Sequence, residues 1–119
     1  MRSIRLPGSA ALLLMLLATA GCHSAYVEAV IQNRTAGPIS LVEVDYPSAS
    51  FGTEDLKPNA DFHYRFKVLG SGDTKVIWTD ARHQEHTLGG PALHEGDEGN
   101  LSVTFGAGGP VWAKAIKAR

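Results

Sequence analysis

The stretch that decides the fold is Phe62-His63-Tyr64-Arg65-Phe66-Lys67-Val68. Apolar and basic side chains alternate along it without a break, so one set can face a core while the other faces water. This period of two predicts a half-buried β-strand, because the apolar residues of an amphipathic helix recur every three or four positions instead. We expect Phe62, Tyr64, Phe66 and Val68 to point inward.

The same alternation recurs on both sides of this stretch. It is clear at residues 42–46 and 101–105, and weaker at 27–32, 75–79, 85–88 and 111–116. The last of these runs is rich in alanine and lysine and is also compatible with a helix. Turn signals built from glycine, proline, asparagine and aspartate separate the runs, at 33–38, 56–60, 69–73 and 80–84.

About seven short strands at roughly ten-residue spacing predict an all-β fold, an antiparallel sandwich. Five aromatic side chains form the expected core: Trp78, Phe62, Tyr64, Phe66 and Phe105.

The composition is that of a globular domain, since the 119 residues are 44% hydrophobic and 19% charged. A single cysteine excludes an intrachain disulfide. A net charge of −1 excludes nucleic-acid binding through bulk charge, so we expect no nucleic acid among its partners.

The N-terminal segment has the three regions of a secretory signal peptide. Arg2 and Arg5 precede an apolar run at 10–18, which small residues follow. As a helix the run extended to Ala20 reaches about 16 Å, half the thickness of a bilayer's hydrocarbon core, so it is too short to span. Cleavage after the small-x-small sequence Ala18-Thr19-Ala20 would release a soluble exported protein.

Thr19-Ala20-Gly21-Cys22 resembles the lipobox of bacterial lipoproteins, with threonine where leucine is usual. The resemblance implies lipidation of Cys22, the only cysteine of the chain, and a membrane anchor of two or three acyl chains. We therefore expect a signal peptide at 1–21, a lipidated cysteine and short tether at 22–26, and the β-sandwich domain at 27–119. The mature chain would carry 9 basic and 12 acidic side chains, a net charge of −3.

The domain itself resembles the disulfide-free immunoglobulin-like or fibronectin-III-like modules of envelope proteins. The strings from Asn33-Arg34-Thr35 to Tyr46-Pro47 and at Leu56-Lys57-Pro58 are similar to small uncharacterised bacterial lipoproteins. This resemblance implies no biochemical role. His23 stands where an aspartate is associated with inner-membrane retention, which favours the outer membrane over the inner one.

Histidines gather near one predicted turn. His83, His86 and His94 lie close in sequence to Glu85 and Glu95, and imidazole suits copper, nickel or zinc. On a strand, positions three apart face opposite sides, so His83 and His86 converge only if a turn intervenes. We treat a metal site here as the alternative to exposed turn and edge histidines, with no metal or other cofactor in the main hypothesis.

Other motifs have structural interpretations. The acidic stretch 95–100 lacks the EF-hand pattern and is expected to be a solvated loop, and the glycines at 89–90 and 106–110 are expected in flexible loops. Asn33-Arg34-Thr35 and Asn100-Leu101-Ser102 match the glycosylation sequon, which we consider coincidental.

Charged stripes are expected on the outer strand faces. His63, Arg65 and Lys67 form a basic stripe, and Glu43 with Asp45 forms an acidic one. We expect them to pair across neighbouring strands, with docking surfaces as the alternative. Trp112 is expected to be buried in the last strand, the alternative being an exposed edge that accepts a partner strand.

No Gly-x-Ser-x-Gly elbow and no nucleophile beside a recognisable base occurs in the sequence. We therefore expect a non-enzymatic protein: a lipid-anchored binding or structural module on an extracytoplasmic membrane face, with other envelope proteins as partners. The alternatives are a periplasmic metal-binding lipoprotein and a hydrolase, which would need a concave pocket with convergent carboxylates.

Overall fold

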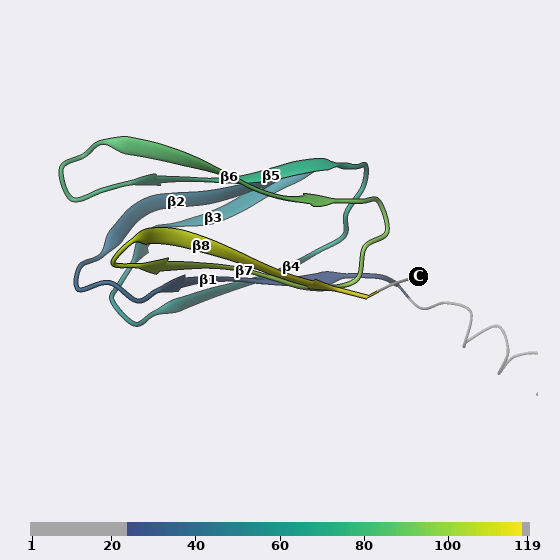
Figure 1. Ribbon diagram of the computed structural model, residues 1–119, viewed down its shortest axis with the longest axis horizontal. Helices are drawn as coiled ribbons and strands as arrows, with labels where there is room; N and C mark the ends of the chain where they lie inside the picture. The colour runs from purple at the N-terminus through teal and green to yellow at the C-terminus, as the bar shows by residue number, and fades with distance from the viewer. Residues whose placement is uncertain (1–23, 118–119) are drawn as a thin grey trace, which may run out of the picture.

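The computed structural model describes residues 24–117, which form eight β-strands. The strands are β1 (Val27–Asn33), β2 (Ile39–Tyr46), β3 (Ala49–Leu56), β4 (Asp61–Phe66), β5 (Gly72–Thr79), β6 (Glu85–Leu93), β7 (Gly99–Gly106) and β8 (Gly109–Ile116). They make two four-stranded sheets, ordered β4-β1-β7-β8 and β3-β2-β5-β6, which face one another (Figure 1). The predicted all-β sandwich is confirmed, with eight strands instead of about seven.

One pair of neighbours, β1 and β7, runs parallel, and the remaining pairs are antiparallel. In a constant-type immunoglobulin domain the first and second strands share a sheet. Here β1 and β2 belong to different sheets. No helix within residues 24–117 is long and apolar enough to cross a membrane.

The core lies between the sheets and follows the predicted alternation. Its fully or almost fully buried apolar side chains are Val27, Ala29, Ile31, Ile39, Val42, Val44, Phe51, Leu56, Phe66, Val68, Val76, Leu93, Leu101, Val103 and Phe105. Most are β-branched or aromatic, the types that fit a pleated surface. The expected inward direction of Val42 and Val44 and of the 101–105 run is confirmed.

Aromatic rings close the side of the sandwich between β3 and β4. Tyr46 stacks on Phe66 with centroids 4.0 Å apart, and Phe51 stacks on Tyr64 at 4.7 Å. Tyr64, expected in the core, is 40% exposed because β4 is the edge strand of its sheet. Phe62 and Trp78 are partly buried, so of the five predicted core aromatics Phe66 and Phe105 are fully inside.

The opposite side of the sandwich is closed by Trp112, which packs against the core as expected. Its indole lies so close to Gly90 of β6 that a Cβ atom there would come within 2.5 Å of the ring. The glycines at 89–90, which we expected in a flexible loop, belong instead to β6. The absence of a side chain at Gly90 leaves space for the Trp112 ring. The 106–110 glycines form the tight turn between β7 and β8.

The two charged stripes lie in different sheets, so the expectation that they pair with each other is wrong. Arg65 of β4 lies 3.2 Å from Glu28 of β1, and its guanidinium sits 3.9 Å from the centre of the Tyr26 ring. In the other sheet Asp45 lies 3.8 Å from Lys75 of β5. Each stripe therefore finds its partners on its own sheet.

The two ends of the sandwich differ in what they carry. Val27, Gly99 and Ile116 are in one register row, so β1 begins and β8 ends at the same end, which we call the base. Asn33, Phe105 and Pro110 form a row at the other end, the tip. Seven residues of strand place the two rows roughly 20 Å apart. Figure 1 shows the β1–β2 and β7–β8 connections at the tip, away from the labelled C-terminus.

Candidate functional site

The sequence-predicted lipidation site is not part of the described structure. Cys22 and His23 lie outside residues 24–117, so the lipobox interpretation stays a prediction. Sequence alone puts Cys22 five positions before β1, which begins at the base.

The structure does not bring the three candidate histidines together. His83 lies in the β5–β6 turn with a positive φ of 62°, and His86 lies near the start of β6. His94 follows the other end of that strand, so eight residues of extended chain separate it from His86 by roughly 26 Å. His94 instead has its Nδ1 3.9 Å from a carboxylate oxygen of Asp97.

The two glutamates of the metal hypothesis accompany these separated histidines. Glu85 is exposed at the first position of β6, and the amide of Glu95 donates to the Ser71 hydroxyl at 3.0 Å. No cluster of three or more histidine, cysteine, aspartate or glutamate side chains suited to a metal ion occurs within 24–117.

The acidic stretch 95–100 forms a turn held by the Asp97 side chain, followed by the first two residues of β7. Asp97 accepts the amide of His94 at 2.8 Å, and the Lys117 ammonium lies 3.6 Å from Glu98. These acids order the connection into β7, and the expected solvated loop is in part packed, because the side chains of Asp97 and Glu98 are 16% and 25% exposed.

A carboxylate pair does occur on the outer face of the second sheet. A hydrogen bond with Asp45 raises the pKa of Glu43 above its ordinary value, and desolvation and the charge of Asp45 raise it further. The groove beside this pair, over β2 and β3, includes Glu54 and the exposed Leu41, whose φ is 49° at a break in the β2–β5 register. Because Asp45 also faces Lys75, the positive charge of Lys75 offsets part of the negative charge of the carboxylate pair.

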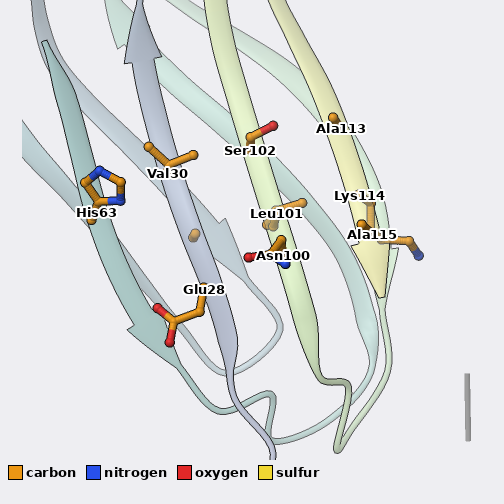
Figure 2. Close-up of a pocket in the computed structure, with 10 residues that line it drawn as sticks. Glu28, Val30, His63, Asn100, Leu101, Ser102, Ala113, Lys114 and Ala115 are labelled. Atoms are coloured by element: carbon orange, nitrogen blue, oxygen red, sulfur yellow. The ribbon is translucent and has the colours of Figure 1, made fainter. Parts of the chain in front are cut away.

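A shallow hollow of about 280 Å³ lies on the outer face of the first sheet (Figure 2). Small side chains form its floor, including Val30, Ser102 and Ala113, which occupy one register row. Glu28 and His63 border it on the β1–β4 side, and Glu28 is already bonded to Arg65. Its polar groups do not converge on one point, so this face suits a flat contact better than a small ligand.

The tip carries a pocket of about 350 Å³ with a more specific lining. It is formed by the β1–β2, β5–β6 and β7–β8 connections and the strand ends beside them. Its lining residues are Thr35, Gly37, Pro38, Ile39, Trp78, Asp80, Ala81, Phe105, Gly106, Ala107, Gly109 and Pro110. The lining includes two aromatic and two proline rings, and Asp80 is the one charged side chain in it.

Asn33 organises the first wall of this tip pocket. It is fully buried, and its side-chain amide donates to the carbonyls of Gly37 and Leu56 at 2.9 and 2.8 Å. Its side-chain oxygen accepts both the amide and the hydroxyl of Thr35. The sequon at 33–35 is therefore a structural turn in which every polar atom of the asparagine side chain is engaged.

Asp80 organises the opposite wall. One carboxylate oxygen accepts the amides of Arg82 and Gln84, and the other lies 2.7 Å from Nε2 of His86. These bonds, that of His86 first, lower the pKa of Asp80 to about 2, because they favour the charged form. Asp80 therefore stays ionised at neutral pH.

Trp78 links the two walls. Its indole is stacked on the His86 ring at 5.2 Å and meets the buried Phe105 edge-on at 5.2 Å. His86, expected either as a metal ligand or as an exposed strand residue, thus supports an aromatic side chain and an ionised carboxylate. The sequence predicts the turn at 80–84 but not the pocket, because the three connections that form the pocket are far apart in the sequence.

This chain matches no protein family, no curated protein and no solved structure in the three comparisons made. The fold and the tip pocket are therefore the basis for a functional proposal.

Proposed function

We propose that the protein is a non-catalytic, lipid-anchored module of the bacterial cell envelope that binds a partner protein through its tip pocket. The domain would be an immunoglobulin-like sandwich in the broad sense, with a strand order that differs from that of a constant-type immunoglobulin domain. The proposal assigns it to an extracytoplasmic membrane face, with the outer membrane favoured.

The observation that carries the proposal is the position of the pocket relative to the chain ends. The first strand begins at the base, and the pocket lies at the tip, roughly 20 Å away along the strands. An anchor at Cys22 would join the domain at its base through a tether of a few residues. The tip pocket would then face away from the membrane, where a partner can reach it.

The lining of the pocket supports binding. Binding sites are mostly apolar concavities with a few fixed polar groups, and the tip pocket combines Trp78, Phe105 and two prolines with one oriented carboxylate. Its walls are already held by hydrogen bonds that Asn33 donates and Asp80 accepts, so little conformational entropy is lost on binding.

The anchor is tested by the intact mass of the protein extracted from bacterial membranes, beside a Cys22→Ala control. We expect residues 22–119 plus acyl chains, and loss of these chains in the control. An unmodified mass beginning at Gly21 would contradict the anchor and indicate a soluble exported domain. Membrane fractionation of the same cells decides between outer and inner membrane.

The binding end is tested separately by photo-crosslinking in cells. A photoreactive residue at Ala81, in the tip pocket, is expected to capture a protein partner, whereas the same residue at Ser48, in the β2–β3 connection at the base, is not. Equal capture from both positions, or capture from Ser48 only, would contradict binding through the tip.

The metal-binding alternative makes a different prediction. It requires saturable Cu²⁺ or Zn²⁺ binding tighter than about 10 μM that is lost in His86→Ala and His94→Ala. Because these two histidines lie at opposite ends of β6, we expect calorimetric titration of the domain to show no such site.

A further inference from the structure

The one charged group of the tip pocket has room for a further hydrogen-bond donor. A carboxylate offers about four acceptor positions. In Asp80 two positions on one oxygen accept backbone amides, and one position on the other oxygen faces His86. One acceptor position is left on the oxygen that faces His86.

Within residues 24–117, no lysine or arginine faces this carboxylate from the pocket lining. Arg34, on the β1–β2 connection, is bound to Asp61 at 2.7 Å, and no arginine or lysine is among the lining residues. A partner covering the pocket would remove water from the carboxylate, which is costly unless the partner brings a positive charge. The pocket therefore selects for a cationic group and against anions.

The rest of the lining selects among cations. The partly buried Trp78, backed by His86 on one side and meeting Phe105 edge-on, supplies aromatic surface, and Pro38 and Pro110 add flat apolar surface. A guanidinium is planar, weakly hydrated and able to stack on aromatic rings while donating to a carboxylate. An ammonium is compact and strongly hydrated, so it gains less in such a pocket.

We propose that the tip pocket binds an arginine side chain presented by the partner protein. The side chain lies along Trp78 and the two prolines, and its guanidinium donates to the remaining acceptor position of Asp80. This assignment rests on the proposed function, because it names the group that the binding module recognises.

The test is an NMR titration of residues 22–119 carrying Cys22→Ser, a chain that contains all eight strands and the complete core. The probe is N-acetyl-arginine methylamide, compared with the neutral citrulline and the lysine analogues. We expect saturable shifts at the Trp78 indole N–H and at the Gly106 and Ala107 amides, with a Kd on the order of 1 mM. The lysine analogue should bind several-fold more weakly, and the citrulline analogue should cause no saturable shift.

A matched pair of variants measures how much the charge of Asp80 contributes to arginine binding. Asp80→Asn keeps a side-chain oxygen for the two turn amides but removes the charge, so arginine binding should weaken at least about fivefold. Asp97→Asn makes the same change in a turn at the base and should leave binding unaltered. Retained protection of the Arg82 and Gln84 amides from solvent exchange in apo Asp80→Asn verifies that its turn is intact, although their shifts change with the acceptor.

Three results would overturn the assignment: equal binding of the citrulline analogue, equal binding of the lysine analogue, or no shift at the tip up to about 50 mM probe. If the probe fails while the Ala81 crosslink still captures a partner, the binding module stands and the arginine assignment falls. If both fail, the proposed function falls as well.

Discussion

At the scale of single residues, Asn33 joins separate segments of the tip through hydrogen bonds. Its side chain joins the β1–β2 connection to the end of β3, and its backbone carbonyl accepts the amide of Asn59 from the β3–β4 connection. Two connections that lie far apart in sequence are thus fixed by one buried amide. The pocket wall at Gly37 and Pro38 depends on this arrangement.

Replacing Asn33 by alanine should lower the free energy of unfolding by about 2–4 kcal/mol, because buried carbonyls and an amide lose their partners. Urea denaturation measures this change. Asn100→Ala, on an exposed position of β7 in the second sequon, is the matched control and should change stability by less than about 0.5 kcal/mol. Similar effects of the two substitutions would contradict the structural role of Asn33.

The ionisation of Asp80 predicts a pH dependence at low pH. Its pKa is lowered to about 2 in the folded state, from an ordinary value of 3.8. A lowered carboxyl pKa stabilises the fold above the unfolded-state pKa, and the contribution disappears as the pH falls through the folded-state pKa. The stabilisation is therefore complete above about pH 5 and is lost toward pH 2.

Urea unfolding of the wild-type protein and Asp80→Asn at several pH values tests this dependence. The wild-type protein should be more stable at pH 5, and its advantage should shrink steadily as the pH falls toward 2. Asp97→Asn provides the comparison at the other end of the molecule. A constant difference between wild type and Asp80→Asn across this range would show that the charge of Asp80 contributes nothing.

At the scale of strands, β6 and β8 meet through a contact that only glycine permits. A Cβ atom on Gly90 would come within 2.5 Å of both the Trp112 ring and the Thr74 hydroxyl, which itself donates to the Pro91 carbonyl. Gly90→Ala should therefore destabilise the protein by about 1–3 kcal/mol and shift the tryptophan fluorescence. Gly89→Ala, whose Cβ would meet nothing within 4 Å, is the control. Equal stability of the two variants would contradict the contact.

Strands with an uninterrupted alternation could be predicted from the sequence, and β3 could not. The 62–68 and 101–105 runs coincide closely with β4 and β7, since their buried positions carry large apolar side chains. In β3 Phe51 and Leu56 are buried, with Gly52, Glu54 and Asp55 exposed between them. The β2–β5 register breaks beside this region, between Ser40 and Glu43, so the apolar spacing does not keep a period of two.

The candidate site was predictable only in its parts. The turn at 80–84 follows from its composition, because aspartate and histidine tolerate turn conformations, and His83 does adopt a positive φ. The pocket depends on which connections meet at one end, and that depends on strand order. The sequence contains no local signal that places β1 beside β7, and so none that brings Pro38 near Pro110.

At the scale of the whole molecule, the parallel pairing of β1 with β7 joins the two ends of the domain. Residue pairs such as Val27 with Gly99 and Asn33 with Phe105 are 72 positions apart. Without β7, β1 would keep β4 as its one neighbour, and a two-stranded ribbon is marginally stable in water. Three of the fifteen core side chains within residues 24–117, Leu101, Val103 and Phe105, would also be lost.

A domain truncated after Glu98 should therefore lack a cooperative unfolding transition, although it retains six of the eight strands. A domain truncated after Ile116 retains all eight strands and should unfold cooperatively, with a small loss from the Lys117 contacts to Glu98. Far-UV circular dichroism during heating distinguishes the two. A sharp transition in the shorter chain would mean that the β3-β2-β5-β6 sheet folds with only β4 and β1 of its partner sheet. The tip pocket would still be incomplete in that chain, because Phe105 and Pro110 of its wall belong to β7 and β8.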